Sequence, residues 1–213
     1  MSSRTQYDSV VAGRGRNRRI AVTGGIGSGK SYVCRLIEAA GFPVFYCDDE
    51  AKRIMRTDAA VRNALTALVG PACYDECGLP VKSELARYIC SGPDNAGRVD
   101  AIVHPAVGRA FERWADRQPS GAVFMECALL FESGFDRYAD LTVLVSAPFE
   151  VRVHRVMERD GITREKALGW MALQMPEEEK ARRAGRILCN GDGDDIGRQT
   201  ELLLADIGHW SVD

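Results

Sequence analysis

The feature that most constrains this chain is a glycine-rich loop, Gly24–Ser31, between an apolar run and an amphipathic segment. The loop reads GGIGSGKS and fits the pattern G-x-x-x-x-G-K-[ST]. The run before it, Arg19–Thr23, is typical of a short buried strand. The segment after it places apolar residues at helical spacing, at Val33, Leu36, Ile37 and Ala40. This strand–loop–helix order predicts a phosphate-binding P-loop rather than a glycine-rich turn that matches by chance.

The residue types explain the chemistry. Glycines let the backbone turn its N–H groups inward, where they and the following helix attract phosphate oxygens. We expect Lys30 to reach the β- and γ-phosphates of ATP and the Ser31 hydroxyl to ligate Mg²⁺. The residues expected to contact the nucleotide along the loop are Gly25, Ile26, Gly27, Ser28, Gly29, Lys30, Ser31 and Tyr32.

Bulk properties exclude several classes of protein. The 213 residues carry a net charge of −2, which gives no general attraction to nucleic acid or anionic membrane. No apolar run approaches membrane-spanning length, and the polar N-terminus lacks the apolar core of a signal peptide. The seven cysteines form no C-x-x-C pair, which favours reduced thiols in a cytoplasmic protein.

Strands alternate with helices along the chain, which predicts a three-layer α/β fold with a parallel sheet. Beyond the first strand, four more are expected, at 42–47, 122–127, 141–145 and 186–189. Helices are expected from His104-Pro105, with Pro105 at the first position, to near Gln118, and from the N-cap Thr163 toward Met175. A last helix should bury Ile196, Leu203, Leu204 and Ile207.

Two mostly helical segments, 51–118 and 150–182, interrupt the nucleotide-binding core, which comprises 19–50, 119–149 and 183–213. A kinase needs a site for its second substrate and a part that closes over the phosphates, and these segments are the candidates. Residues 1–18 are expected to be a disordered extension; a basic arm that touches nucleic acid is the alternative.

A set of short motifs makes the chain similar to the dephospho-coenzyme A kinase family over about residues 19–205. The motifs are Thr23–Ser31, Tyr46–Lys52, Val103–Pro105, Glu126–Glu132, Arg159–Gly161, Gln174 and Asn190. The resemblance implies a P-loop kinase core, a helical CoA-binding region at 51–118 and a lid at 150–182. We also expect a monomer or weak homo-oligomer with a small-molecule substrate and no nucleic-acid or membrane partner.

The activity implied is transfer of the γ-phosphoryl group of ATP to the ribose 3′-hydroxyl of dephospho-CoA, the final step of CoA biosynthesis. The D-x-D segment usual in the family aligns with Tyr46-Cys47-Asp48, so only its second aspartate is present. The resemblance makes Asp48 the catalytic base that contacts the acceptor hydroxyl; a carboxylate there could also hold Mg²⁺ through water. The alternative is that Asp48 or Asp49 caps the next helix.

The lid motif of the family places Arg159 where it would stabilise charge on the γ-phosphate. The alternative is a solvated arginine paired with Glu158 or Asp160. Arg155, one turn earlier, is a second candidate for contact with substrate. Four further arginines are expected to be solvated: Arg152, Arg164, Arg182 and Arg183.

Other positions carry weaker implications. His104 either contacts the CoA-like substrate or only marks a helix start, and Lys82 stands where many relatives have arginine. Asn190 aligns with the loop that holds adenine, and Glu126 ends a strand where an acid could approach Mg²⁺. Three departures from the family pattern affect the adenine side and the lid: Tyr32, Trp170 and Gly185.

Two rival functions remain. The first is another metabolite kinase, for a nucleoside or a nucleoside monophosphate. The second is a nucleotide-dependent switch, which is disfavoured because a GTP switch should carry an N-K-x-D motif and the sequence has none.

Overall fold

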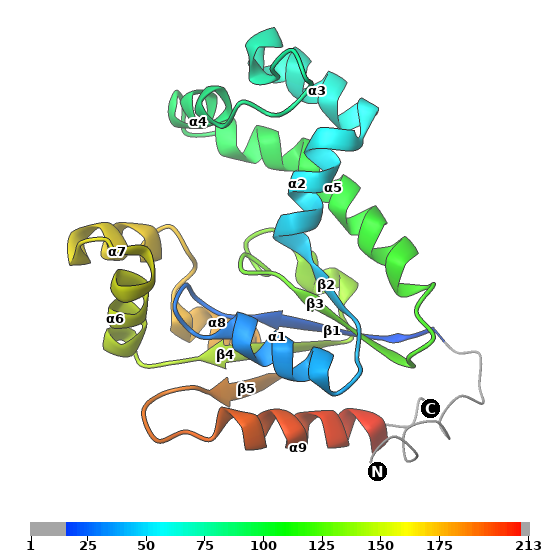
Figure 1. The fold of residues 1–213 in the computed structure, drawn as a ribbon, viewed down its shortest axis with the longest axis vertical. Coiled ribbons are helices and arrows are strands. Elements are labelled where there is room, and N and C mark those ends of the chain that lie inside the picture. Colours follow the sequence, from blue (N-terminus) through cyan, green and yellow to red (C-terminus); the bar gives the residue numbers. More distant parts are fainter. Residues whose placement is uncertain (1–15, 210–213) are drawn as a thin grey trace. The chain divides into compact units, whose positions relative to one another are not determined.

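The computed structural model describes residues 16–209, and the chain divides into two compact units (Figure 1). One unit contains the described residues up to Phe45 and from Ala115 onward; the other is Tyr46–Trp114. None of the helices in the described part is long and apolar enough to cross a membrane.

The first unit is built on a five-stranded parallel sheet with the strand order β2-β3-β1-β4-β5. Its strands are β1 (Arg18–Thr23), β2 (Val44–Tyr46), β3 (Ala122–Glu126), β4 (Leu141–Ser146) and β5 (Arg186–Cys189). The central strand β1 pairs with both β3 and β4 and is almost wholly buried. Burial on both faces is why these strands read as continuous apolar runs.

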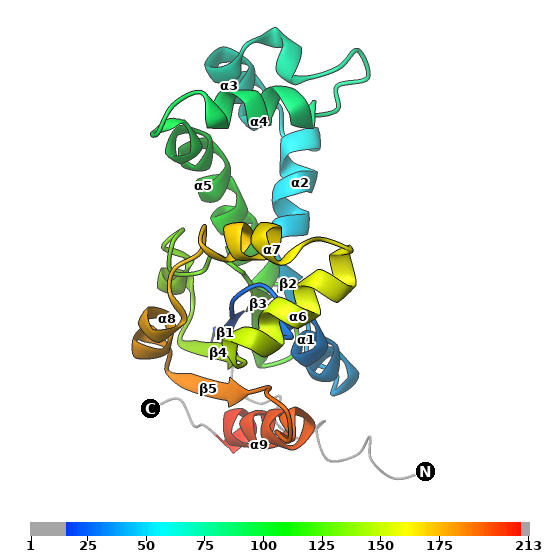
Figure 2. The ribbon, with the colours of Figure 1, turned by 90° about the vertical axis from the view of Figure 1, so that its left-hand side faces the viewer.

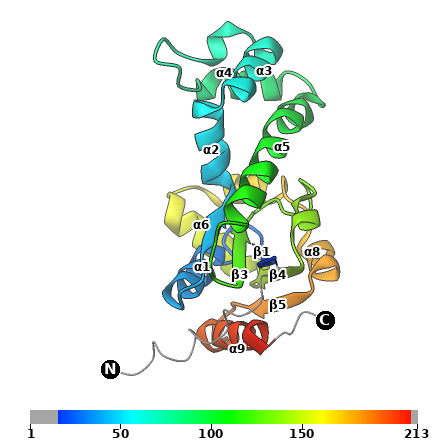
Figure 3. The same cartoon turned by 90° about the vertical axis from the view of Figure 1, so that its right-hand side faces the viewer.

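Helices cover both faces of this sheet. Helix α1 (Lys30–Ala39) packs against α9 (Ile196–His209) on one face, and α8 (Glu177–Arg183) contacts β4 on the other, as Figures 2 and 3 both show. Helices α6 (Phe149–Asp160) and α7 (Arg164–Met171) pack on each other, and a short 3₁₀ helix, η2 (Phe135–Tyr138), precedes β4. The expected three-layer α/β fold is confirmed.

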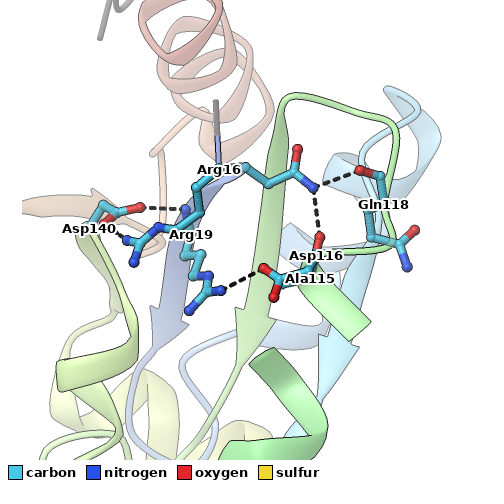
Figure 4. Close-up of polar contacts among 7 residues, drawn as sticks. Arg16, Arg19, Ala115, Asp116, Gln118 and Asp140 are labelled. Atoms are coloured by element: carbon cyan, nitrogen blue, oxygen red, sulfur yellow. Dashed lines mark hydrogen bonds and ion pairs between the residues drawn. The ribbon is translucent and has the colours of Figure 1, made fainter. Parts of the chain in front are cut away.

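Polar contacts fix the amino-terminal end of β1 (Figure 4). The Arg19 backbone N–H donates to Asp140 at 2.8 Å, and its guanidinium pairs with Asp116 at 2.8 Å. Arg16 also pairs with Asp140, and the Asn17 side chain donates to two backbone carbonyls. Residues 16–18, which were expected to belong to a disordered extension, therefore make defined contacts, and residues 1–15 lie outside the described part.

The second unit is helical and consists of α2 (Cys47–Thr57), α3 (Ala59–Val69), α4 (Lys82–Cys90) and α5 (Asn95–Ala115), with a 3₁₀ turn, η1 (Pro71–Cys73). The Asp58 side chain caps α3 by accepting from the backbone N–H groups of Ala60 and Val61. Within this unit α2 and α5 lie side by side (Figures 2 and 3).

One predicted helix start is wrong. Pro105 lies inside α5, which begins at Asn95, and His104 is therefore not a helix-start residue. A proline inside a helix removes one backbone hydrogen bond. The apolar face of α5 is buried on both sides of Pro105, at Val99, Val103, Ala106, Val107 and Phe111, and this packing keeps the helix continuous.

Other predicted ends of strands and helices differ from the observed ones by a few residues. The second strand is only Val44–Tyr46, because Cys47 already begins α2. Ala40 is an exposed C-cap rather than part of the apolar face of α1, and α7 ends at Met171 rather than near Met175. Thr163 caps α7 as expected, by accepting from Lys166 N–H.

Candidate active site

The glycine-rich loop lies between β1 and α1, as the sequence predicts. Gly27 and Gly29 have φ of +81° and +98°, a region that side chains disfavour. A Cβ on Gly27 would lie 2.6 Å from the Arg152 carbonyl oxygen, and one on Gly29 would overlap the Asn190 amide. Both glycines are therefore required by conformation and by space.

Two hydroxyls inside this region are buried with no protein partner. Among the described residues, Thr23 Oγ1 and Ser28 Oγ are buried and make no hydrogen bond. Unsatisfied buried hydroxyls are unusual in folded proteins and point to a missing ligand, ion or water. They lie in the segment where the sequence predicts bound phosphate and metal.

Lys30 opens α1 and is nearly buried. Its Nζ lies 4.0 Å from Glu126 Oε1 at the end of β3, and both side chains are about nine-tenths buried. This 4.0 Å separation is longer than a direct hydrogen bond. Cys34 lies one turn along α1, and burial raises the pKa of its thiol to about 12, so it stays protonated and inert.

The donor set around Lys30 fits Mg²⁺ bound together with nucleotide. No group of three His, Cys, Asp or Glu side chains in the described part could hold a metal by itself. Mg²⁺ keeps several waters and commonly takes one or two protein oxygens plus substrate phosphates. The exposed Ser31 hydroxyl and the Glu126 carboxylate would supply those protein oxygens.

Two residues expected to contact the nucleotide, Asn190 and Tyr32, also contact other parts of the protein. The Asn190 side chain donates to the Ser28 carbonyl at 2.7 Å, so it supports the P-loop itself. Tyr32 is exposed on the first turn of α1, with the guanidinium of Arg35 5.8 Å from its ring.

The arginines of α6 differ in their surroundings. Arg159 is exposed and pairs with Asp160 at 2.7 Å. In this structure it is therefore the solvated, paired arginine that the sequence analysis gave as the alternative to a phosphate contact. The hydrogen bond to Asp160 raises the pKa of Arg159, while the same contact lowers the pKa of Asp160. Arg155 is half-buried, and in the described structure its Nη1 is buried without a hydrogen-bond partner.

The expectation of a solvated Arg152 is wrong. Arg152 is 6% exposed, its Nε donates to the Ile26 carbonyl at 3.1 Å, and it forms an ion pair with Glu177. Sequence periodicity could not reveal this, because both partners are distant in the sequence. The other three arginines are exposed as expected: Arg164 pairs with Glu150, and Arg182 and Arg183 pair with Glu179.

Three of the four residues expected to bind the acceptor, Asp48, Lys82 and His104, belong to the second unit, and Arg155 belongs to the first. Asp48 is the second residue of α2 and is exposed; the N-cap is Tyr46, with no capping side chain, so neither Asp48 nor Asp49 is the cap. His104 pairs with Asp100 at 3.4 Å, and Lys82 is exposed at the first position of α4.

Sequence reasoning missed a second buried cation. Lys180 in α8 is fully buried, lies 3.1 Å from Glu132 and donates to the Ala128 carbonyl. Glu132 also accepts from the backbone N–H of Met175 at 2.8 Å. In the sequence, Glu132 was noted only as the last residue of the Glu126–Glu132 motif, without a role. No sequence pattern indicated that Lys180 would be buried.

A cavity of about 800 Å³ opens at the carboxyl ends of β4 and β5, beside the segment that carries α6, α7 and α8. Arg152, Gln174 and Glu177 form part of its wall, together with Cys189 and Asp194. The segment from α6 to α8 therefore borders both this cavity and the glycine-rich loop.

A family model described as dephospho-CoA kinase matches residues 18–195. The chain belongs to the dephospho-CoA kinase family. The match includes the P-loop, Lys30, Glu126, Arg152 and Gln174, and so extends over both the loop and the segment that contacts it.

Curated relatives in this dephospho-CoA kinase family cover most of the chain. The dephospho-CoA kinase of Thermus thermophilus is 39% identical over 191 residues, which is 88% of this chain and 91% of the relative. That of Bacteroides fragilis is 39% identical over 177 residues, covering 83% and 85% of the two chains.

Solved structures show a similar fold. A crystal structure of a protein from Thermus thermophilus has a TM-score of 0.78 at 38% identity and covers 90% of this chain and 98% of its own. Dephospho-CoA kinase from Campylobacter jejuni has a TM-score of 0.60 at 18% identity, over 91% and 98% of the two chains. At that identity the second likeness concerns the fold alone.

Proposed function

We propose that this chain transfers the γ-phosphoryl group of ATP to the ribose 3′-hydroxyl of dephospho-CoA, giving CoA and ADP. The observation that carries the proposal is the P-loop, with a nearly buried Lys30, in a chain that the dephospho-CoA kinase family model matches from Arg18 to Asp195. Phosphoryl transfer depends mainly on positioning and on charge neutralisation, and this loop is suited to both.

On the nucleotide side, the loop N–H groups and Lys30 would bind the phosphates and withdraw charge from them. Mg²⁺, held by Ser31 with Glu126 nearby, would neutralise phosphate charge when bound. Arg155 has a buried, unpartnered Nη1 that a ligand oxygen could satisfy. Arg159 would have to exchange Asp160 for phosphate to reach its expected role.

On the acceptor side, Asp48 is proposed as the base. Its carboxylate would take the proton of the 3′-hydroxyl as the new O–P bond forms and the bond from the γ-phosphorus to the β–γ bridging oxygen breaks, releasing ADP. Asp48 is exposed and makes no hydrogen bond or ion pair among the described residues. Its neighbours Asp49 and Glu50 pair with Lys52 and Arg53, which leaves Asp48 as the available carboxylate of this turn.

A cavity in the helical unit supports an anionic acceptor. It has a volume of about 210 Å³ and lies between α2 and α5; its charged lining residues are Arg53, Arg109 and Arg113 and the single acid Asp58, which caps α3. Arg109 and Arg113 stand one turn apart on α5, where like charges repel. Arg53 already pairs with Glu50, so the other two cations would be the ones to bind the phosphates of dephospho-CoA.

The remaining expectations are part of the same proposal. The protein would act in the cytoplasm as a monomer or weak homo-oligomer, with a small-molecule substrate and no nucleic-acid or membrane partner. The net charge of −2 supports this. The competing proposal, a nucleoside or nucleoside-monophosphate kinase, shares the P-loop and differs only in the acceptor.

The test is coupled ADP release with ATP, Mg²⁺ and a panel of hydroxyl acceptors. Dephospho-CoA should be the preferred acceptor, and a nucleoside that reacts in its place would overturn the proposal. Lys30→Met should abolish turnover while the protein stays folded. Asp48→Asn should lower kcat at least a hundredfold with little change in substrate affinity, and wild-type turnover in this variant would reject Asp48 as the base.

A further inference from the structure

The tip of the P-loop is held at three points by the segment that carries α6, α7 and α8. The Ile26 backbone N–H donates to Gln174 Oε1 at 2.8 Å, and the Ile26 carbonyl accepts from Arg152 Nε at 3.1 Å. The Ile26 side chain packs against an apolar cluster of α6 and α7, formed by Val153, Val156, Ala167 and Met171. None of these partners belongs to the G-x-x-x-x-G-K-[ST] pattern.

These contacts fix the two peptide planes on either side of Ile26. Its N–H belongs to the Gly25–Ile26 peptide, and its carbonyl belongs to the Ile26–Gly27 peptide. In a planar trans peptide the carbonyl and the N–H point in opposite directions. Because Arg152 holds the Ile26 carbonyl, the Gly27 N–H is directed away from Arg152. Glycines on both sides of Ile26 would otherwise leave these planes free to rotate.

Arg152 is itself held in place. It is buried, and Nη1 forms an ion pair with Glu177 at the first position of α8. Its guanidinium also fills the space beside Gly25, where any Cβ would overlap it. Gly25 has no positive φ in this structure, so glycine is needed there for space and not for conformation. The arginine therefore explains a residue that the general P-loop pattern leaves open.

We propose that Arg152 and Gln174 are positioning residues that preset the P-loop backbone for phosphate. Neither needs to touch the nucleotide: each acts through the peptide planes of Ile26. The inference rests on the proposed function only in assuming that the loop binds a nucleotide phosphate, and it holds for any acceptor.

This role makes a specific prediction for ligand affinity. ADP and adenosine share the nucleoside, but only ADP needs the loop N–H groups. Gln174→Met removes the acceptor for Ile26 N–H at nearly constant side-chain size, and it should weaken ADP binding about tenfold, the factor expected for one buried hydrogen bond. Adenosine affinity should change less than twofold. Leu173→Ala, on the adjacent and 81% exposed residue, is the matched control and should leave both affinities unchanged.

A second pair of variants tests Arg152 through Gly25. Gly25→Ala should weaken ADP binding at least tenfold in the wild-type background, because the new methyl group displaces the guanidinium. In an Arg152→Ala background the same change should have less than a threefold effect. Equal effects in the two backgrounds would show that Gly25 is required for another reason.

Equilibrium binding of ADP and adenosine, with urea midpoints for every variant, decides between the outcomes. The proposal is overturned if ADP and adenosine weaken together, or if Gln174→Met binds ADP like the wild type while folded. If wild-type protein phosphorylates no dephospho-CoA but ADP binding shifts as expected, the acceptor assignment fails and the positioning role stands.

Discussion

The buried ion pair between Lys180 and Glu132 offers the sharpest test of what stabilises the unit that contains the parallel sheet. Lys180 is fully buried; its ammonium lies 3.1 Å from Glu132 and donates to the Ala128 carbonyl at 3.3 Å. Lys180→Met keeps the length of the side chain and removes the charge. It leaves the Glu132 carboxylate without its counter-ion in a partly buried site.

The expected loss in the free energy of unfolding follows from the unpaired charge on Glu132. Breaking a buried pair by removing one partner costs about 3–5 kcal/mol. Glu132 keeps the hydrogen bond from Met175, and its side chain is 23% exposed, so the lower end, about 3 kcal/mol, is expected. For a chain of this size, that corresponds to a fall in Tm of roughly 6–12 °C.

Urea unfolding of the ligand-free protein at pH 7 measures this loss. The double variant Lys180→Met/Glu132→Gln should regain most of the stability, because glutamine still accepts from Met175 but carries no charge. A loss below about 0.5 kcal/mol in Lys180→Met, or a double variant no better than the single one, would refute the reasoning.

Three further predictions concern acid stability, a helix cap and the acceptor. Burial alone would raise the pKa of Glu132, but the Met175 N–H and Lys180 outweigh it and lower the pKa. A lowered folded-state pKa gives stability that is lost on acidification. The difference in free energy of unfolding between the wild type and Glu132→Gln, measured with urea, should therefore shrink below about pH 4.3. Asp58→Ala should cost about 1 kcal/mol in the same assay, because α3 loses its N-cap; no change would mean that water replaces the cap. Arg113→Gln should raise the KM for dephospho-CoA several-fold and leave that for ATP unchanged, whereas Arg87→Gln, outside the arginine-lined cavity, should change neither.

Local patterns were sufficient for much of the fold. Short apolar runs identified all five strands and period-3.6 apolar spacing identified most helices, because backbone geometry and burial are properties of near neighbours. The P-loop was identified for the same reason: its glycines, lysine and serine act within a single strand–loop–helix unit. Cap chemistry at Thr163 also depends on only three residues and was correct.

Local rules failed where distant packing opposed them. Pro105 has the signature of a helix start, yet the buried face of α5 continues past it, and the packing outweighs one missing backbone hydrogen bond. An arginine on a polar-looking helix face is usually solvated, and Arg164, Arg182 and Arg183 follow that rule. Arg152 does not, since a carbonyl far away in the sequence and the Glu177 carboxylate satisfy it.

The amino-acid sequence by itself determined the phosphate-binding loop, the α/β order of elements and the family, because each is encoded by residues that are close together or occur in a fixed order. Only the tertiary structure decided which side chains hold that loop. Ile26 meets Arg152 and Gln174 across separations of 126 and 148 residues, and Lys180 of α8 meets Glu132 of the segment between β3 and η2. Contacts over such distances arise from how the sheet and its helices pack, which no local pattern records.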